Sequence, residues 1–370
     1  MKKFAIPSGT KDLLFDECRS KKQLQKEIEQ VFESYGYQEI MTPTIEFFKT
    51  YQVGFEDVQE EAMYKFFDEN GRILVLRADM TIPIARVATT KLKGNALPLR
   101  FYYCANVYKV KQTFAGKRNE VSDCGIELLG SNRQESDLEV LVCALEVMEK
   151  MQQKAYTLEL SDVRFFEQAC KLVAMKESEK AKLASLIDSK SLTELESYLN
   201  QLQLDEKVKD FFMQLPWLGG NVEVLEEAKS YCFHESLLQV IDDLKVYCDQ
   251  LSALGYEQYI TYDLGKIPHL NYYSGLIFEG YIENVGNSVL SGGRYDQLLE
   301  KFNESMPAIG FSVKLDYVLN AYQYSEQKAK VVVSYPLELQ LEAFKYAKQL
   351  RKDKIVIMKV DQSKTEIEVN

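Results

Sequence analysis

Apolar residues recur at intervals of three and four positions in residues 16–35, where Leu24, Ile28 and Val31 fall on one side of a helix. This spacing predicts an amphipathic helix with one buried face. Residues 40–45 follow after a glycine and contain a proline, which restrains the residue before it to extended conformations. An extended segment is therefore expected directly after the first helix.

Two β-hairpins are predicted from pairs of apolar runs. Residues 66–76 hold an Asn-Gly pair between two short runs, the usual sequence of a tight hairpin turn. Residues 99–108 and 121–129 form a second, longer pair around a polar, glycine-containing loop. The first half of the chain therefore contains antiparallel strands.

The composition changes after residue 164, where a helical stretch rich in Lys, Glu, Leu and Ser begins. Strand patterns resume in residues 259–263, 272–281 and 288–290. The predicted class is α+β, with an antiparallel sheet flanked by helices. The predicted divisions are a core of residues 1–164 and 255–322, an inserted helical domain of residues 165–254 and a short α/β tail of residues 323–370.

The stretch that begins with Gly292-Gly293-Arg294 is expected to form a glycine turn and then a short helix. Residues 307–313 indicate a buried strand that runs into another helix near Tyr317. Glycines let a backbone come close to other atoms, so this layout often brings backbone amides beside a ligand. A ligand site is therefore expected near these residues.

Composition and charge narrow the classes of function. The 370 residues are 46% hydrophobic and 27% charged, enough for two or three domains with full cores. The formal net charge of -11 makes nucleic acid an unlikely partner, because phosphate binding depends on clustered Lys and Arg. No apolar run approaches the ~20 residues of a membrane helix, and the first residues lack the apolar core of a signal peptide. A cytoplasmic protein without membrane contact is expected.

Cysteines and histidines give little sign of reactive chemistry. The seven cysteines are an odd number without a C-x-x-C pair, so they are predicted to be buried small hydrophobes in a reducing compartment. The only histidines are His234 and His269, which excludes a histidine-rich metal centre. Neither lies near a nucleophile motif, and both are interpreted as structural. No metal or cofactor is expected.

Five segments, in this order along the chain, carry a resemblance to a known family. They are Ile40-Met41-Thr42-Pro43, Leu76-Arg77-Ala78-Asp79-Met80-Thr81, Val107-Tyr108-Lys109 through Cys124-Gly125-Ile126-Glu127, Asn271-Tyr272-Tyr273-Ser274-Gly275, and Gly292-Gly293-Arg294-Tyr295-Asp296. Over roughly residues 5–320 the chain resembles class II aminoacyl-tRNA synthetases, in particular the histidyl enzyme and its non-catalytic paralogue. The resemblance implies the class II fold and a dimer formed through the first helix and the strand at Pro43.

The resemblance also implies a pocket for histidine. By position, Asp79, Thr81 and Asp123 match the groups around the α-amino end of the ligand, and Glu127 and Tyr273, with Tyr272 beside it, match those at the imidazole. Three carboxylates in one cleft favour a cationic ligand, since a nearby opposite charge stabilises the ionised form.

Structural roles remain open for the same residues. Asp79 or Thr81 is a natural N-cap for a helix that starts near residue 81, and Tyr272 and Tyr273 are common types in a strand. Glu127 stands in an apolar strand, where an unpaired carboxylate costs free energy, and this favours a function for it.

The chain departs from the synthetase pattern where that pattern binds ATP. The resemblance places Lys109 at the arginine that holds the α-phosphate, and Lys111 at a glutamate. It places Pro268 at the arginine that faces the reacting carboxylate, with His269 at a glycine, and Tyr317 at a second ATP-binding arginine. Arginine binds anions bidentately, whereas proline and tyrosine cannot. Aminoacylation is therefore not expected.

The resemblance implies a non-catalytic regulatory subunit of ATP phosphoribosyltransferase, in histidine biosynthesis. Such a chain is expected to assemble with a short-form catalytic subunit, which needs it for activity, and to take part in feedback by histidine. The tail is expected to be a truncated remnant of the synthetase anticodon-binding domain. Two alternatives stay open: a divergent active synthetase or adenylating enzyme, in which Lys109, Arg118 and Arg294 replace the lost arginines, and an RNA-binding regulatory module.

Overall fold

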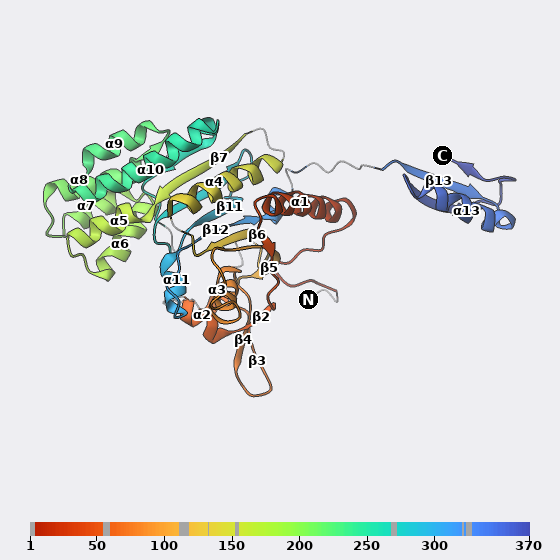
Figure 1. Cartoon of the computed structure of the whole chain (residues 1–370), viewed down its shortest axis with the longest axis horizontal. Coiled ribbons are helices and arrows are strands. Elements are labelled where there is room, and N and C mark those ends of the chain that lie inside the picture. Colours follow the sequence, from red (N-terminus) through yellow and green to blue (C-terminus); the bar gives the residue numbers. More distant parts are fainter. Residues whose placement is uncertain are drawn as a thin grey trace. The chain divides into compact units, whose positions relative to one another are not determined.

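A computed structural model describes residues 4–54, 60–110, 118–131, 133–151, 155–267, 272–319, 322 and 328–370 (Figure 1). The chain divides into two compact units, Met1–Tyr322 and Gln323–Asn370, and each is described by itself. No helix among the described residues combines the length and the apolar character required to cross a membrane.

A nine-stranded sheet organises the described part of the first unit, in the order β1-β5-β6-β12-β11-β10-β7-β9-β8. The strands from β5 to β7 in this order are antiparallel, whereas β1 with β5 and β9 with β7 are parallel pairs. The predicted α+β class is confirmed. The strands are β1 (Gln38–Glu39), β5 (Leu99–Tyr108), β6 (Glu120–Leu129), β7 (Tyr156–Asp162), β8 (Gly219–Gly220), β9 (Ile260–Asp263), β10 (Leu276–Ile282), β11 (Leu290–Arg294) and β12 (Ala308–Lys314).

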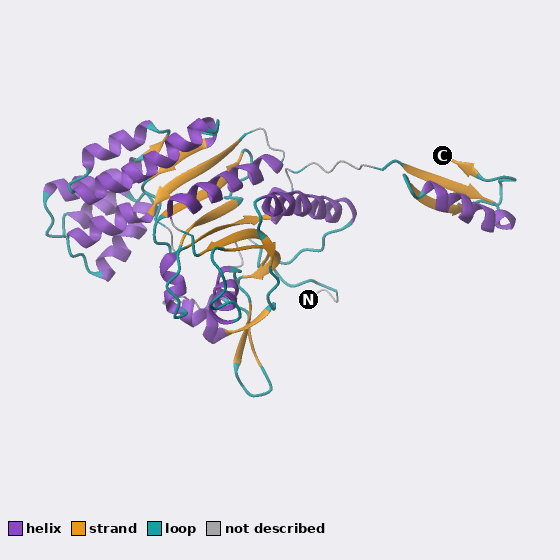
Figure 2. Cartoon of the chain, in the orientation of Figure 1, coloured by secondary structure: helices purple, strands orange, loops and turns teal. Residues whose placement is uncertain are grey.

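Helices cover both faces of this sheet (Figure 2). They are α1 (Phe15–Ser34), α2 (Phe48–Gly54), α3 (Thr81–Thr90), α4 (Arg133–Lys150), α5 (Val163–Leu172), α6 (Glu177–Asp188), α7 (Leu192–Leu199), α8 (Glu206–Gln214), α9 (Glu223–Tyr231), α10 (Glu235–Ala253), α11 (Asp296–Lys301) and α12 (Leu315–Val318). The predicted first helix is confirmed as α1, and its Leu24, Ile28 and Val31 are buried.

Side chains alternate between the two sheet faces, and the two cores follow this alternation. On one face Tyr102, Ile126 and Leu128 join the larger core, which includes the buried residues of α1 and α4. On the other face Tyr103 and Leu129 join a second core with residues of α2, α3 and α11. Neighbouring residues of one strand therefore belong to different environments.

The two predicted hairpins are confirmed. Strands β3 (Lys65–Phe67) and β4 (Ile73–Leu76) pair antiparallel and form a small sheet with β2 (Ile45–Phe47) in the order β2-β4-β3. The longer hairpin is β5 with β6, in which Leu99 opposes Leu129 and Tyr108 opposes Glu120.

The helices from α5 to α10 gather at one end of the sheet, beyond β7 (Figure 1). Their buried Phe165, Phe211 and Leu244 belong to the same core cluster as Leu158 of β7. The helical segment thus shares its hydrophobic core with the sheet. The division into a core of residues 1–164 and 255–322 and a separate domain of residues 165–254 stays a prediction.

The expected glycine turn at Gly292-Gly293 is wrong, because both residues lie inside strand β11. In the register they oppose Phe311 and Gly310 of β12. A Cβ on Gly292 would come within 2.4 Å of the Phe311 Cβ, and one on Gly293 within 2.7 Å of the Leu276 carbonyl oxygen. These glycines therefore allow close packing inside the sheet. The short helix and the buried strand predicted after them are confirmed as α11 and β12.

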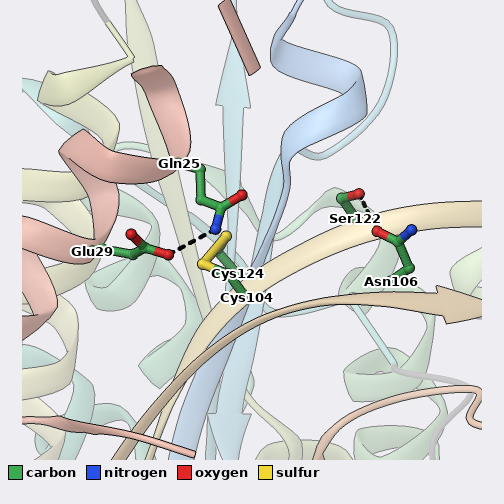
Figure 3. The surroundings of a disulfide bond; sticks show 6 residues. All are labelled: Gln25, Glu29, Cys104, Asn106, Ser122 and Cys124. Carbon is green, nitrogen blue, oxygen red and sulfur yellow. Dashed lines mark hydrogen bonds between the residues drawn. A yellow bond between two sulfur atoms is a disulfide. The ribbon is translucent and has the colours of Figure 1, made fainter. Parts of the chain in front are cut away.

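Cys104 of β5 and Cys124 of β6 form a disulfide, with their Cα atoms 4.1 Å apart (Figure 3). The two residues oppose each other in the register and lie beside Gln25 of α1. The prediction of unpaired cysteines is wrong for this pair, because cysteine spacing alone does not show which residues a hairpin register brings together. The other five are free, and Cys143 and Cys170 are buried as predicted.

The second unit is a small α/β element. Strands β13 (Lys330–Tyr335) and β14 (Ile355–Val360) are parallel and joined through α13 (Gln340–Leu350), and β15 (Glu368–Val369) pairs antiparallel with β13. Its core is small and consists of Val333, Tyr335 and Ala343, with partly buried neighbours.

Candidate functional site

A cavity of about 560 Å³ opens on the sheet face that carries Tyr103. Strands β5, β6, β10, β11 and β12 contribute to its wall, together with the start of α3 and the residues before β10. It brings together all six residues predicted to form the ligand pocket: Asp79, Thr81, Asp123, Glu127, Tyr272 and Tyr273. These residues come from three separate segments of the chain.

Glu127 lies at the centre of this site and is 2% exposed. Its Oε1 accepts a hydrogen bond of 2.7 Å from the Thr81 hydroxyl, and its Oε2 accepts one from the Tyr295 hydroxyl. Burial raises the pKa of the Glu127 carboxyl to about 7, although the bonds from Tyr295 and Thr81 oppose the rise. The carboxylate is therefore poised to ionise when a cation enters.

Gly310 makes room for Glu127 in the neighbouring strand, where the two residues are register partners. A Cβ on Gly310 would lie 2.1 Å from the Glu127 Oε2 and 2.3 Å from the carbonyl oxygen of Ile126. The second of these atoms is backbone and cannot move easily. The floor of the cavity therefore requires glycine at this position.

Asp79 and Thr81 have different roles at the start of α3. The Asp79 carboxylate accepts a 2.9 Å hydrogen bond from the Ile82 backbone N–H, as an N-terminal capping group does. The Thr81 hydroxyl instead donates to Glu127. Burial raises the pKa of Asp79, and Lys109 opposes that rise. Asp79 thus caps the helix and also adds a carboxylate to the cavity.

Asp123 lines the cavity without an internal partner for one of its oxygens. Its Oδ1 is buried and has no hydrogen-bond partner among the described residues. Burial raises the pKa of the Asp123 carboxyl to about 6, and Lys109 and Lys314 act against the rise. An unpaired buried carboxylate oxygen costs free energy, so this atom indicates a ligand that donates a hydrogen bond.

Tyr272 and Tyr273 precede β10 and are not part of it, so the predicted strand from residue 272 is wrong for these two residues. Their ring centroids are 4.7 Å apart, and the Tyr272 ring meets the Tyr295 ring edge-on at 5.9 Å. Burial raises the pKa of the Tyr273 phenol to about 12. The three tyrosines form one aromatic wall of the cavity.

Lysines also line the cavity. The Lys266 amine donates to Glu159 at 2.7 Å, and to Glu279 and the Tyr281 hydroxyl at 2.8 Å each. Lys314 and the exposed Lys109 complete the set. The cavity therefore contains both carboxylates and ammonium groups, which a zwitterionic ligand would require.

Of the two predicted ATP-site positions that the structure describes, Lys109 and Tyr317, the first lines the cavity. Lys111, Pro268 and the adjoining His269 lie outside the described residues. Tyr317 is partly buried on α12 beside the larger core and does not reach the cavity. Tyr317 therefore takes no part in the described pocket.

The alternative of a divergent active enzyme requires two arginines, Arg118 and Arg294, and both are bonded to other residues of the chain. Arg294 is fully buried, and its guanidinium donates to Asp137 and Ser136. Arg118 pairs with Asp316 at 2.7 Å. Neither residue lines the cavity, so the structure does not favour the suggestion that they replace the lost ATP arginines.

Sequence reasoning missed Tyr295 and Tyr103, which both line the cavity. Tyr295 belongs to the motif that drew attention to Gly292, and its alternation with the buried Arg294 could have placed it on the opposite face. The same reasoning applies to Tyr103: it follows Tyr102, which belongs to the larger core, so it is expected on the opposite face of the sheet.

The family model described as histidyl-tRNA synthetase matches residues 9–318. A Bacillus thuringiensis (strain Al Hakam) protein named ATP phosphoribosyltransferase regulatory subunit is 37% identical over 359 residues, or 95% of this chain and 85% of that protein. A Bacillus anthracis (strain A0248) protein of the same name has the same identity and coverage. The chain belongs to the histidyl-tRNA-synthetase-like family of ATP phosphoribosyltransferase regulatory subunits. Its relatives are named for regulation and not for catalysis, which agrees with the tyrosine at position 317.

Solved structures support the family assignment. A Bacillus halodurans C structure, described as an ATP phosphoribosyltransferase regulatory subunit/histidyl-tRNA synthetase, superimposes with a TM-score of 0.88 at 28% identity and covers 99% of this chain and 95% of that one. A histidyl-tRNA synthetase from Nostoc sp. PCC 7120 gives a TM-score of 0.81 at 22% identity, over 99% of this chain and 88% of that one. The second likeness shows the shared fold alone.

Proposed function

We propose that this chain is the non-catalytic regulatory subunit on which a short-form catalytic subunit of ATP phosphoribosyltransferase depends for activity. In this proposal the cavity binds histidine and transmits feedback inhibition to the partner. Support comes from the family of regulatory subunits to which the chain belongs and from the chemistry of the cavity.

The observation that carries the ligand assignment is the buried, unpartnered Oδ1 of Asp123 beside Asp79 and Glu127. Burial raises the pKa of each of these three carboxyls, and a bound ammonium or imidazolium would reverse that rise. A ligand that prefers one of two assembly states shifts the population toward that state. A cationic amino acid is therefore a suitable signal at this cavity.

The alternative of an active adenylating enzyme requires cationic groups that hold ATP phosphates. Arg118 and Arg294 are engaged in ion pairs and do not line the cavity, and position 317 is a tyrosine. Lysine at position 109 provides a point charge and not the bidentate fork of arginine. These features favour regulation over aminoacyl transfer, and the net charge of -11 disfavours a module that binds RNA.

Assembly into a homodimer within a hetero-oligomer is also part of the proposal. Large apolar side chains are exposed at the start of α1 and after β1, including Phe15 at 80% and Met41 at 82%. Such residues are common where a second chain covers them. A cytoplasmic location is also part of the proposal: five cysteines are free, as expected where thiols stay reduced, although the Cys104–Cys124 disulfide does not support this location.

The test mixes the purified chain with a short-form ATP phosphoribosyltransferase catalytic subunit and measures co-elution and phosphoribosyl transfer. We expect a stable complex and an activity that requires both chains, while histidine-dependent exchange of pyrophosphate into ATP stays at background. A catalytic subunit that is neither bound nor activated would contradict the proposal. Pyrophosphate exchange above background would instead favour the active synthetase.

A further inference from the structure

Lys314 and Asp123 face each other on adjacent strands at one end of the cavity. They are register partners between β12 and β6, and both line the cavity. The Asp123 Oδ1 has no hydrogen-bond partner, and no described residue forms a hydrogen bond or ion pair with the Lys314 amine. Two opposite charges thus lie in neighbouring positions without neutralising each other directly.

The other lysines of the cavity are less suited to receive an anion. Lys266 is held by Glu159, Glu279 and the Tyr281 hydroxyl, so its donors are already engaged. Lys109 is exposed, and water competes for its charge. Burial lowers the pKa of Lys314, while Asp123 and Glu279 act against that change. Lys314 is therefore an incompletely solvated ammonium with open donors.

We infer that Lys314 receives the α-carboxylate of the bound amino acid while Asp123 receives its α-ammonium. This inference rests on the proposed binding of histidine and names the group that recognises the carboxylate. A charge-assisted pair on each side of the α-carbon selects a free amino acid over an amine or a blocked acid.

The strand register sets the direction of the ligand. Gly310 opposes Glu127, whereas Lys314 opposes Asp123 four residues further along β12. These positions share one sheet face and are about 13 Å apart at ~3.3 Å per residue. The imidazole lies toward Glu127, the ammonium lies beside Asp123, and the carboxylate lies at Lys314.

Lys314 approaches the ligand from strand β12, opposite the Asp123 of β6 that receives the ammonium. The side chain projects into the cavity from the last residue of β12. Lys314 supplies a cation from a different strand.

The test compares L-histidine with L-histidinol, in which a hydroxymethyl group replaces the carboxylate. Both are titrated calorimetrically into the full chain and into its complex with the catalytic subunit. We expect the wild type to prefer histidine by about 10–100-fold, the effect of one charge-assisted hydrogen bond. In Lys314→Met this preference should fall to about equal affinity, because histidine binding weakens while histidinol binding stays.

Three further variants make the result specific. Lys314→Arg keeps the charge and should retain most of the preference, and Lys314→Gln, an uncharged polar variant, should lose it as the methionine variant does. Lys109→Met removes a charge from the same cavity and should retain the preference within about threefold. Thermal unfolding of each variant checks that it is folded.

The outcomes separate this inference from the proposed function. If histidine binds the wild type but Lys314→Met keeps the preference, or loses both ligands equally, the role of Lys314 is refuted and histidine binding stands. If Lys109→Met loses the preference for histidine to the same extent, the role of Lys314 is also refuted. The combined charge of the cavity lysines, and not Lys314 itself, would then hold the carboxylate. If histidine binds neither the chain nor the complex, the proposed histidine site fails together with this inference.

Discussion

Arg294 and Tyr295 are consecutive residues, and each donates a hydrogen bond to a carboxylate in a different part of the molecule. The Arg294 guanidinium is fully buried and bonded to Asp137, Ser136 and Asp296, so its donors have partners within the chain. Tyr295 points into the cavity and donates to Glu127. Two adjacent residues thus belong to different places: Arg294 to a cluster in which it is fully hydrogen-bonded, and Tyr295 to the cavity, where a buried oxygen of Asp123 has no partner among the described residues.

The two clusters differ in how their carboxylates are satisfied. Asp137 accepts from Arg294 and from the Tyr247 hydroxyl at 2.6 Å, and it is fully buried. In the cavity, Asp123 keeps a buried oxygen without a partner, and burial raises the pKa of Glu127 to about 7. Charges that stabilise the fold are paired internally, whereas charges left unpaired at a cavity indicate a ligand.

Breaking the complete cluster should have the largest effect on stability. Arg294→Met leaves Asp137 buried without its cation, and we expect a loss of about 3–5 kcal/mol in the free energy of unfolding, measured with urea. The double variant Arg294→Met/Asp137→Leu should recover most of this loss, because an apolar pair replaces the ion pair. A loss below about 1 kcal/mol in the single variant would show that this cluster does not support the fold.

Filling the floor of the cavity should have an intermediate effect. Gly310→Ala places a Cβ against the Glu127 carboxylate and the Ile126 carbonyl oxygen, so we expect destabilisation by about 1–3 kcal/mol and loss of histidine binding. The matched variant Gly36→Ala is at a glycine with no atom near its Cβ, although its φ of 77° adds strain. It should affect stability only, and a Gly310→Ala chain that binds histidine normally would contradict the described cavity.

Removing the Glu127 carboxyl should change how stability depends on pH. The folded pKa of Glu127, about 7, lies above its ordinary 4.5, so the folded state holds the extra proton between these values. Wild-type stability should therefore fall as pH rises from about 4.5 to about 7. Glu127→Gln lacks this fall, and its stability relative to wild type should rise by roughly 1–3 kcal/mol over that range, since one pKa unit is about 1.4 kcal/mol.

Denaturant unfolding of the Glu127→Gln variant at pH 4.5 and pH 8 measures this difference. Histidine binding should weaken in the same variant, because a neutral amide replaces the carboxylate that pairs with the imidazolium. A difference between variant and wild type that is the same at both pH values would mean that folding does not raise the pKa of Glu127.

Much of the fold was predictable because it depends on local patterns. The apolar spacing of Leu24 and Ile28 predicted α1, and the Asn-Gly pair predicted the turn between β3 and β4. Gly292-Gly293 was misread as a turn, because glycine serves both turns and close strand packing, and only the neighbouring Phe311 decides between them.

The sequence predicted which residues line the site, but not which of them contact each other. Asp123 and Glu127 were identified through the family resemblance, and the structure places both at one cavity. The bond from Tyr295 to Glu127, the disulfide at Cys104 and the pairing of Lys314 with Asp123 all depend on strand register. Register joins distant segments, and no spacing within a single segment encodes it.

The central claim is that the carboxylates of the cavity receive histidine and thereby regulate a catalytic partner. It is tested most directly by histidine inhibition of the assembled ATP phosphoribosyltransferase, carrying wild-type chain, Asp123→Asn or the exposed control Asp210→Asn. The account predicts full activation by all three and an inhibition constant about 10–100-fold higher for Asp123→Asn alone. Equal inhibition of all three complexes by histidine would contradict it.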